Sequence, residues 1–373
     1  MEFNILEICL LTALCICFFV HLYYVIGVHA KLVGYRIADL PNSTSQPLSV
    51  VICARNEREN LEKYLPSIFE QDYPNFEVVV VNDRSWDGTV DFLETLQKKY
   101  SNLKVVHVAE GEKFIAGKKF AATMGIKAAS HDWLVFTDAD CEPATKNWLK
   151  GMQMPADNQV DILLGYSPYF KKRSLLNALI RFETFFTAVN YLSFALKGMP
   201  YMGVGRNMAY KKSLFFKNKG FAAHMHIPSG DDDLFVNANA TPVNTIIQIH
   251  KDTHVWSEPK NSFLSYLRQK KRHIGAGNLY KTKHKFILST QIAVQFFFYA
   301  LAITLACFPR THFIAVGVFL FSLMVRCFVY PKLLKRLNYG ELRWWFPILD
   351  IILMAFLVFN AILSIFVKKV QWK

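Results

Sequence analysis

The sequence predicts an α/β domain with a doubly wound, mostly parallel sheet, set between N-terminal and C-terminal transmembrane helices. Short β-branched runs alternate with helix-like stretches between residues 48 and 155, one long apolar segment lies near the N-terminus, and three apolar blocks lie near the C-terminus. Alternating strands and helices are typical of a parallel sheet covered on both faces. We expect an anchor over residues 1–30, a linker over 31–47, a cytosolic domain over 48–280 and transmembrane or interfacial helices over 281–373.

The first apolar segment, Ile5 to Val28, is about long enough to cross a bilayer. Glu2 and Glu7 lie at its start, whereas a cleaved signal peptide has a basic start and a shorter apolar run. We therefore expect a retained membrane anchor. Because Lys31 and Arg36 follow the segment, the positive-inside rule places the N-terminus outside and the next domain in the cytosol.

Four runs in the next part of the chain have the composition of buried strands. They are Leu48–Cys53, Phe76–Val81, Lys104–Val108 and Trp133–Thr137. The stretches between them carry apolar residues at helical spacing, over Asn60–Gln71, Thr89–Tyr100 and Lys118–Ala129. Ligands of such a sheet bind where the carboxyl ends of the strands meet. The functional residues are therefore expected directly after the strands.

A further helix is predicted from Leu175, where apolar residues recur at helical spacing behind the basic triplet 171–173. A basic entry and an aromatic face favour a helix that lies in the membrane interface. A helix that packs on the sheet has the same period, so the spacing leaves both interpretations open.

Three apolar blocks near the C-terminus, Phe286–Phe308, Phe313–Tyr330 and Trp344–Val367, approach the length of a membrane span. The middle block is short and contains Arg326. With the N-terminal segment, this predicts four spans. The basic residues 368–369 fit poorly with a last block that crosses outward, so this block can instead be re-entrant or interfacial.

The composition agrees with a membrane protein. Hydrophobic residues make up 52% of the chain and charged residues only 19%, which leaves apolar side chains to face lipid. The formal net charge is +14, but the basic residues are dispersed beside apolar stretches and form no basic, aromatic stripe. We therefore expect no nucleic-acid partner, and we expect anionic lipid headgroups and phosphorylated substrates instead. The seven cysteines form no CxxC pair, so neither a zinc site nor a disulfide framework is indicated.

Polar residues follow the first two predicted strands. Ala54, Asn56 and Glu57 come after the first strand, and Asp83 comes after the second. A carboxylate in this position can accept hydrogen bonds from a base or from ribose hydroxyls. Asp87, which precedes a Gly-Thr pair, has the pattern of a turn and helix cap.

Two carboxylates one residue apart, Asp138 and Asp140, follow the fourth predicted strand. Mg²⁺ and Mn²⁺ prefer oxygen ligands and keep some positions for water and phosphate oxygens. Such a cation would neutralise negative charge on a departing diphosphate. At this place in the strand order, the pair predicts a site for Mg²⁺ or Mn²⁺.

Three consecutive acids, residues 231–233, precede an apolar pair further along the chain. Crowding raises the proton affinity of at least one of them, which suits a general base. Acids also favour the start of a helix, and the two interpretations are compatible. The basic run at residues 268–273 is either a juxtamembrane patch or a clamp for a diphosphate.

Taken in chain order, these segments resemble the inverting glycosyltransferases of family 2, in the membrane-bound branch that is similar to processive synthases and has the GT-A fold. The resemblance covers about Leu48 to Tyr280. In that family an Ala-x-Asn-Glu loop and the acid after the second strand hold the nucleotide. The resemblance implies this role for Ala54, Asn56, Glu57 and Asp83, and it places Lys118, after Gly117, near the same pocket.

The resemblance also implies roles for the later segments. Asp138 and Asp140 would hold the metal, and Asp138 would also contact the donor diphosphate. In the segment Gly-Arg-Asn-Met-Ala, Gly205 and Asn207 would line the acceptor side. The family's acidic motif carries the base. The run from 230 to 234 aligns with it in two registers, which makes Asp231 the first choice and Asp232 the second.

The family's Gln-x-x-Arg-Trp motif appears here with Gln269 and Arg272 but with His273 in place of Trp. In processive synthases this Trp lies at the acceptor end, so its absence argues against synthesis of a long polymer. Arg272 can still bind the donor diphosphate.

The resemblance therefore implies a transferase that moves a sugar from a nucleotide-sugar, by default a UDP-sugar, to a lipid-linked or membrane-proximal glycan by a single displacement. Its expected place is an integral, multi-pass position with the catalytic domain in the cytosol, as in a bacterial inner membrane. Two alternatives stay open: a processive polysaccharide synthase, and a non-catalytic membrane scaffold that binds nucleotides.

Overall fold

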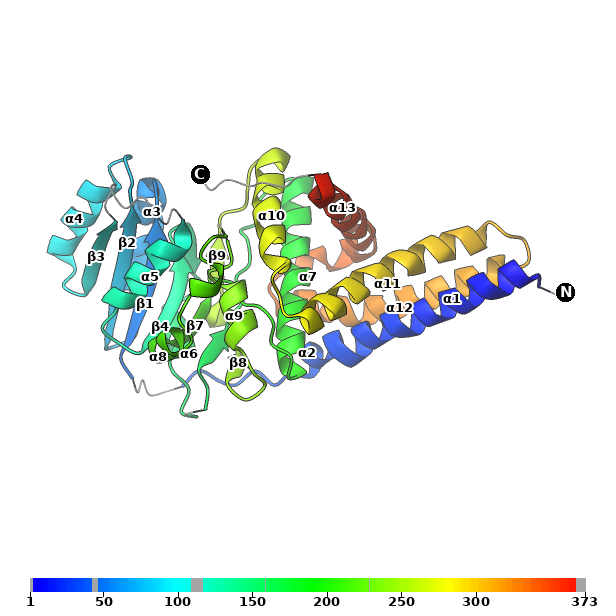
Figure 1. Ribbon diagram of the computed structural model, residues 1–373, viewed down its shortest axis with the longest axis horizontal. Helices are drawn as coiled ribbons and strands as arrows, with labels where there is room; N and C mark the ends of the chain where they lie inside the picture. Colours follow the sequence, from blue (N-terminus) through cyan, green and yellow to red (C-terminus); the bar gives the residue numbers. More distant parts are fainter. Residues whose placement is uncertain (1–2, 42–45, 109–116, 158, 228, 367–373) are drawn as a thin grey trace.

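The computed structural model describes residues 3–41, 46–108, 117–157, 159–227 and 229–366. The chain forms an α/β domain and a group of long helices beside it, with a layer of helices between the two (Figure 1). The predicted fold class, a mostly parallel sheet with apolar helices before and after it, is confirmed.

The main sheet has seven strands in the order β3-β2-β1-β4-β7-β6-β8. Their bounds are β1 Leu48–Ala54, β2 Phe76–Asp83, β3 Leu103–Val108, β4 Trp133–Asp138, β6 Ile162–Leu164, β7 Met208–Lys211 and β8 Thr245–Ile247. The first four strands pair in parallel, as predicted. The antiparallel strand β7 and the short strands β6 and β8 extend the sheet beyond β4, and the sequence pattern did not predict them.

The predicted helices cover both faces of the parallel part. They are α3 (Arg58–Phe69), α4 (Thr89–Lys99) and α5 (Lys118–Ala128). Alternate valines of β2 join different cores: Val78 and Val80 pack with α3 and α4, whereas Val79 and Val81 pack on the side of α5. A strand buried on both faces needs apolar residues at every position, which is why β2 is nearly all valine.

Smaller elements complete the domain around the sheet. A two-stranded sheet pairs β5 (Cys141–Pro143) with β9 (Val255–Ser257). The short helices are α6 (Trp148–Met152), α8 (Lys212–Lys217), η2 (Ala222–His224), α9 (Asp233–Asn239) and η3 (Lys251–Thr253).

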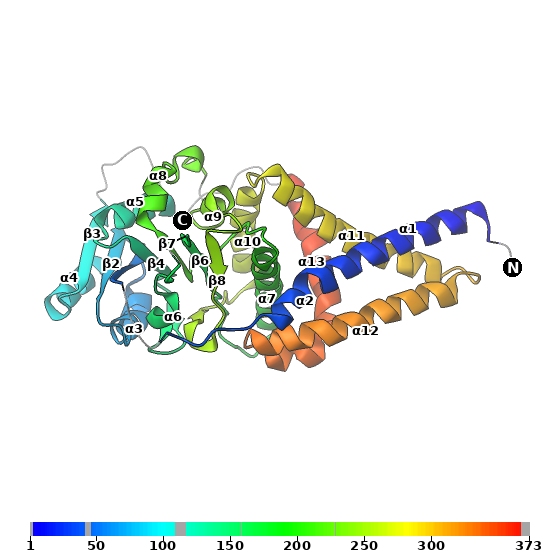
Figure 2. The ribbon, with the colours of Figure 1, turned by 90° about the horizontal axis from the view of Figure 1, so that it is seen from below.

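Two helices, α7 (Leu175–Leu196) and α10 (Phe263–Gly277), lie between the sheet and the long helices (Figures 1 and 2). The helix predicted from Leu175 is therefore present as α7. It contacts β8 of the sheet as well as elements of the helical part. Its apolar stripe, including Phe182, Phe185 and Val189, is buried. The stripe thus packs inside the protein.

The helical part begins with a continuous run of α1 (Ile5–Leu22), a π-helical segment η1 (Tyr23–His29) and α2 (Ala30–Gly34). It continues with α11 (Thr282–Ala306), α12 (His312–Arg336), η4 (Gly340–Trp345) and α13 (Phe346–Phe366). Four helices of the described chain, including the run from α1 to α2, are long and apolar enough to cross a membrane.

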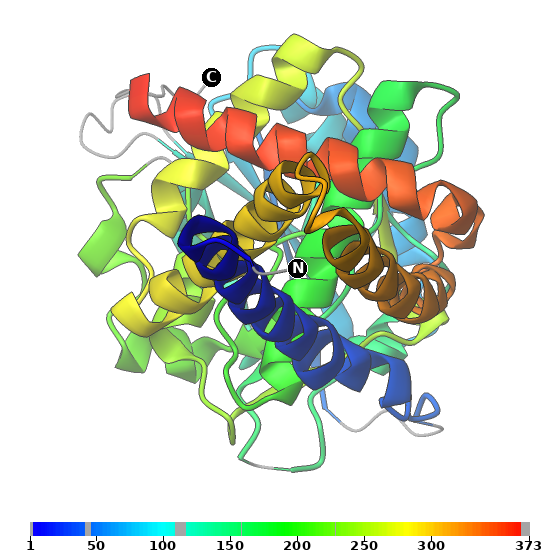
Figure 3. The same ribbon diagram turned by 90° about the vertical axis from the view of Figure 1, so that its right-hand side faces the viewer.

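The long helices do not all run in one direction. Helices α1, α11 and α12 lie side by side and extend away from the α/β domain (Figure 1). Helix α13 crosses them and packs on α7 (Figure 3). The outer surface of the three-helix bundle is apolar, with Phe19, Phe286 and Phe313 exposed by 67%, 70% and 85%. An apolar surface of this kind suits contact with lipid.

A buried ion pair joins α12 to α13. The guanidinium of Arg326 contacts the carboxylate of Asp350, and these side chains are 1% and 3% exposed. The hydroxyl of Tyr299 on α11 donates to Asp350 and accepts from Arg326. Gln295 Nε2 also donates to Asp350 at 3.4 Å. The pair therefore fixes α13 against both α11 and α12.

Candidate active site

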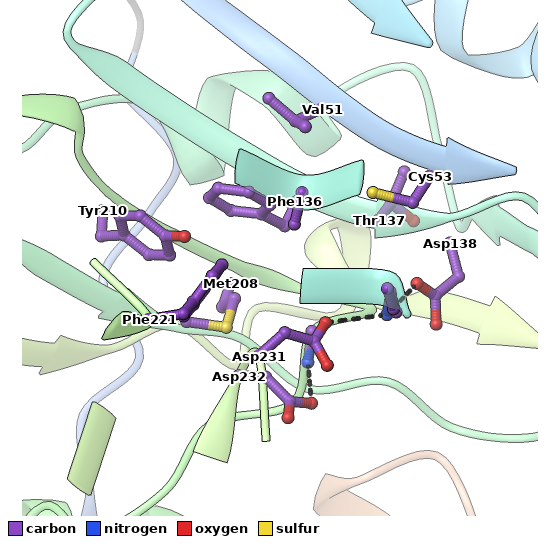
Figure 4. Close-up of a pocket in the computed structure, with 13 residues that line it drawn as sticks. Val51, Cys53, Phe136, Thr137, Asp138, Met208, Tyr210, Phe221, Asp231 and Asp232 are labelled. Carbon is purple, nitrogen blue, oxygen red and sulfur yellow. Dashed lines mark hydrogen bonds and ion pairs between the residues drawn. The ribbon is translucent and has the colours of Figure 1, made fainter. Parts of the chain in front are cut away.

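The segments that follow the parallel strands converge on one pocket of about 340 Å³ at the carboxyl edge of the sheet (Figure 4). Its polar wall is formed by Lys118, Thr137, Asp138, Asp231 and Asp232. Apolar side chains from β1, β4 and β7 form the rest of the lining, together with Phe221. The pocket thus joins residues from distant parts of the chain, as expected for the edge of a parallel sheet.

Lys118 connects two of the acids. Its Nζ lies 2.8 Å from Asp138 Oδ1 and 3.2 Å from Asp231 Oδ2. Lys118 is the first residue of α5, whereas Asp138 is the last residue of β4. One ammonium group therefore holds the end of β4 next to the acidic triplet.

The charges in this pocket shift each other's protonation. Burial alone would lower the pKa of Lys118, but Asp138 and Asp231 raise it well above its ordinary value. Burial raises the pKa of Asp231, with further contributions from Asp232 and Asp138, while Lys118 opposes the shift. Asp231 is therefore a stronger base than an exposed carboxylate.

The three consecutive acids have three different environments. Asp232 Oδ2 accepts a hydrogen bond from Gly205 N at 2.8 Å, and Asp232 Oδ1 accepts one from Asp233 N at the start of α9. Asp233 Oδ2 accepts from Tyr280 Oη at 2.8 Å. Only Asp231 of the three carries an ion pair with Lys118 among the described residues. This geometry gives Asp232 and Asp233 local structural bonds and turns Asp231 toward the pocket.

The positions of two glycines make this arrangement possible. Gly230 has φ +91°, a conformation that residues with a Cβ rarely adopt. At Gly205 a Cβ would lie 3.2 Å from Asp232 Oδ2, so a larger residue would push this carboxylate away.

Asp140 lies two residues after Asp138, close enough for the charge of Asp138 to act on it. Burial and the charge of Asp138 raise the pKa of Asp140, whereas Arg206 and Lys260 act in the opposite direction. A divalent cation between Asp138 and Asp140 would relieve this repulsion. Within the described residues, no group of three or more His, Cys, Asp or Glu side chains could hold a metal ion by itself. The two carboxylates therefore fit a cation that takes its remaining ligands from a diphosphate and water.

The predicted nucleotide-side residues lie at the ends of β1 and β2. Ala54 is buried, and the φ angle of Asn56 is +55°. Asn56 Oδ1 accepts from Trp86 N at 3.0 Å, so the Asn56 side chain ties the loop after β1 to the loop after β2. Asp83 Oδ1 accepts from Arg84 Nε at 2.7 Å, and Glu57 accepts from the side chain of Asn60. The four predicted residues lie at the ends of the paired strands β1 and β2 or in the loops that follow them, and none of the four is among those that line the pocket.

Asn207 departs from the expectation that it lines the acceptor side. The side chain is fully buried: Oδ1 accepts from Trp148 Nε1 at 3.0 Å, and Nδ2 donates to the carbonyls of Tyr166 and Thr253. It therefore braces the loop behind the pocket. Its neighbour Gly205 does line the pocket.

The two predicted residues of the basic run lie on α10. Gln269 Nε2 donates to Tyr169 Oη at 3.2 Å, which brings α10 next to the loop that carries Arg206. The backbone of Arg272 belongs to α10, but its side chain lies outside the part of the structure that is described. The Arg272 diphosphate clamp therefore stays a prediction.

Two residues near the site had no role in the sequence interpretation. Lys119 is only 2% exposed, and its Nζ donates to the carbonyls of His224 at 2.6 Å and Ile227 at 3.3 Å. It clamps the segment that leads to the acidic triplet. Arg206 stacks on Tyr169 beside Asp140. A Gly-Lys-Lys start of a helix is the only sequence signal for Lys119, and Arg206 has none of its own.

Comparison with known proteins agrees with this geometry. The family model described as glycosyl transferase family 2 matches residues 49–217. Glycosyltransferase AglE of Haloferax volcanii is 34% identical over 126 residues, which cover 33% of this chain and 40% of that protein. A dolichyl N-acetyl-alpha-D-glucosaminyl phosphate 3-beta-D-2,3-diacetamido-2,3-dideoxy-beta-D-glucuronosyltransferase of Methanococcus voltae is 33% identical over 98 residues, covering 26% of this chain and 30% of that protein. The chain thus spans less than half the length of these relatives.

One solved structure matches almost the whole chain. The mannosyltransferase PcManGT from Pyrobaculum calidifontis, in complex with GDP-Man and Mn²⁺, aligns with a TM-score of 0.64 and 19% identity. The alignment covers 98% of this chain and 100% of that one. At this identity the likeness shows a shared fold, including the helices outside the α/β domain.

Proposed function

We propose that this chain, whose residues 49–217 match the model of glycosyl transferase family 2, is a membrane-anchored, inverting glycosyltransferase that uses a nucleotide-sugar and a divalent cation. The convergence of Lys118, Asp138 and Asp231 on one pocket at the end of β4 carries this proposal. The acceptor is a lipid-linked or membrane-proximal glycan.

The nucleotide lies along the rim formed by the loops after β1 and β2. Asn56 joins these two loops, and Asp83 at the end of β2 offers a carboxylate to the base or the ribose. Ala54 and Glu57 shape the same rim, and the helix α10, which carries Gln269 and Arg272, approaches the diphosphate. PcManGT, which shares the fold, binds GDP-Man. UDP stays the default nucleotide for this chain by family resemblance. Turnover of nucleotide-sugars with different bases would decide between them.

Asp138 and Asp140 would hold the cation, Mn²⁺ or Mg²⁺. A bound cation supplies positive charge that stabilises the leaving nucleoside diphosphate. Lys118, already paired with Asp138, adds a second positive charge at the same place. The two carboxylates would thus bind the cation together.

Asp231 acts as the general base. It removes the proton from the acceptor hydroxyl while the oxygen attacks the anomeric carbon, and the bond to the diphosphate breaks on the opposite side. The configuration at the anomeric carbon is inverted. Burial and two neighbouring acids raise the pKa of Asp231, which strengthens it as a base. Asp232 positions the loop through its bond to Gly205, and so it supports Asp231.

The arrangement of the helices supports a site close to a bilayer. If α1, α11 and α12 span the membrane, then α7 and α13, which run across the bundle axis, lie near its surface (Figures 1 and 3). The domain-side ends of the bundle carry the basic residues Lys31, Lys281, Lys283, Lys335 and Arg336. By the positive-inside rule, this charge distribution supports an α/β domain in the cytosol and an N-terminus outside. The relative from Methanococcus voltae carries a dolichyl-linked acceptor in its name, which supports a lipid-linked acceptor here.

The test is release of nucleoside diphosphate by the detergent-purified protein. A panel of nucleotide-sugars is supplied with Mn²⁺, with Mg²⁺ and with EDTA, and membrane lipid extract serves as the acceptor. We expect turnover of one donor that depends on the metal and is lost in Asp140→Ala. No turnover across the panel, with the parent protein folded, would favour the non-catalytic scaffold.

A further inference from the structure

Arg206 is a cation at the margin of the pocket with a hydrogen-bond donor that the protein does not use. It follows Gly205, which lines the pocket. Its guanidinium lies over the ring of Tyr169, 4.3 Å from the ring centroid. Its Nη1 is buried and has no hydrogen-bond partner among the described residues. A buried N–H of a charged group without a partner is destabilising, so the arrangement calls for an acceptor that binds there.

The nearby acids do not supply this partner. Arg206 interacts electrostatically with Asp140 and Asp138, but in the described part of the chain none of its nitrogens forms an ion pair with a carboxylate. Lys260 acts on Asp140 from the same surroundings. Under the proposed function both acids bind a divalent cation. The positive charges of Arg206 and Lys260 would then lack a nearby counter-charge, which favours an anionic ligand.

Tyr169 fixes the orientation of the guanidinium. Its ring is 7% exposed, its backbone N–H donates to Tyr339 Oη at 2.5 Å, and its hydroxyl accepts from Gln269 Nε2. A guanidinium held flat on a rigid ring keeps its N–H groups in one plane. Planar, fixed donors suit the oxygens of a phosphate group, which a flexible ammonium group binds only as a point charge.

We propose that Arg206, oriented by Tyr169 and assisted by Lys260, binds a phosphate group of a substrate. This inference rests on the proposed function and deepens it, because it adds a phosphate-binding residue whose charge acts on Asp140, in addition to Lys118, which pairs with Asp138. The same chemistry can come from two sources. One is the phosphate of a lipid acceptor, and the other is the diphosphate of the donor.

The experiment measures equilibrium binding to the detergent-purified full chain, without turnover. Three probes are used with Mn²⁺ present: a nucleoside diphosphate, farnesyl phosphate and farnesol. The variants are Arg206→Gln and Arg206→Lys. Arg343→Gln is the matched control, because the Arg343 guanidinium also lies over an aromatic ring, 4.9 Å from the centroid of Trp344, but neither Arg343 nor its neighbours in the chain line the pocket.

We expect Arg206→Gln to weaken binding of a phosphate probe about tenfold or more, which is typical for loss of a charged hydrogen bond. Arg206→Lys should give an intermediate loss, and farnesol binding and the control should not change. A loss confined to farnesyl phosphate identifies the acceptor as the source, and a loss confined to the nucleoside diphosphate identifies the donor. Unchanged affinity for both phosphates overturns the inference.

Two further points keep the result interpretable. If Arg206→Gln does not fold, Arg206→Lys and Lys260→Gln provide the same comparison with smaller changes. Nucleoside diphosphate release by the parent protein is measured separately. Turnover by the parent together with unchanged phosphate binding in the variants would reject the role of Arg206 and leave the proposed function intact.

Discussion

Two clusters of opposite charge lie in this molecule, and they differ in their surroundings. At the carboxyl edge of the sheet, Lys118 pairs with Asp138 and Asp231 beside an open pocket. Between α12 and α13, Arg326 pairs with Asp350 where both side chains are almost completely buried. The first cluster has room for a ligand next to its charges. In the second cluster the charged groups contact only one another and neighbouring side chains of the described helices.

The difference shows that crowded charges alone do not mark an active site. A buried ion pair is weak evidence for stability, but removing one partner leaves an uncompensated charge. At the sheet edge the same chemistry is combined with a cavity, a second carboxylate at Asp140 and the unused donor of Arg206. Substitutions in or beside each cluster should therefore have different effects on activity and on stability.

Replacement of the base should have the largest effect. Asp231→Asn removes the proton acceptor, and we expect the transfer rate to fall about 10²–10⁴-fold, the usual contribution of general base catalysis. The thermal midpoint should change little, because within the described residues the ion-pair partner of Asp231 is Lys118, which keeps Asp138. Rates and unfolding curves of the same preparations check this. Activity close to that of the parent would contradict the assignment of the base.

Replacement in the buried pair should affect folding instead of chemistry. Asp350→Ala leaves the Arg326 guanidinium buried without its carboxylate, and we expect a loss of about 3–5 kcal/mol in the free energy of unfolding. Activity per folded molecule should stay unchanged. Unfolding in detergent and the active fraction after purification measure the two quantities.

The double variant Arg326→Met with Asp350→Leu is the matched control for this prediction. Two apolar side chains of similar volume remove both charges, so stability should return to near the parent value. A double variant as unstable as Asp350→Ala would mean that Arg326 and Asp350 act on stability independently.

Loosening the loop behind the base should have a smaller effect. In Lys119→Met the carbonyls of His224 and Ile227 lose their donor, and we expect kcat to fall about tenfold because Asp231 is less well positioned. KM for the donor should stay the same, since Lys119 does not line the pocket. Lys127→Met, an exposed lysine on the same helix, serves as the control. An increase in KM without a change in kcat would assign Lys119 to donor binding.

The smallest effect concerns Asp233 and pH. Burial, the charge of Asp232 and other neighbours place the pKa of Asp233 at about 7. Between about pH 4 and pH 7 the folded state keeps a proton that the unfolded state has released, so stability falls as the pH rises through this window. Asp233→Asn should reduce the slope of this fall by about 1 kcal/mol per pH unit. Unfolding midpoints at pH 5 and pH 8, with the exposed Asp91→Asn as control, test it; equal slopes for all three proteins would contradict the assigned shift.

The sequence predicts the parallel half of the sheet well because its strands are buried on both faces. Runs such as the valines of β2 have few other interpretations. Strands β6, β7 and β8 have only three or four residues each, too short for a period to appear. Part of the Gly205–Ala209 segment, interpreted as an acceptor loop, therefore belongs to the antiparallel strand β7.

Some residues of the site could also be predicted from the sequence, and others could not. The acids at the strand ends could be predicted as site residues, because the carboxyl ends of parallel strands meet at one edge of the sheet. Asn207 was misplaced because nothing in its local sequence shows that Trp148 occupies its side chain. The contacts of Lys119 and Arg206 are with residues far away in the chain. Lys119 donates to the carbonyl of His224, and Arg206 lies over the ring of Tyr169. The different course of α13 could be raised from the basic residues 368–369 only as an alternative, because apolar length does not give direction.

The most direct test of the account is the anomeric configuration of the first product. Once the donor is known, NMR of the isolated product gives this configuration. A single displacement with Asp231 as the only base predicts inversion relative to the nucleotide-sugar. A product with retained configuration would require a second displacement, and it would contradict the mechanism proposed for this pocket.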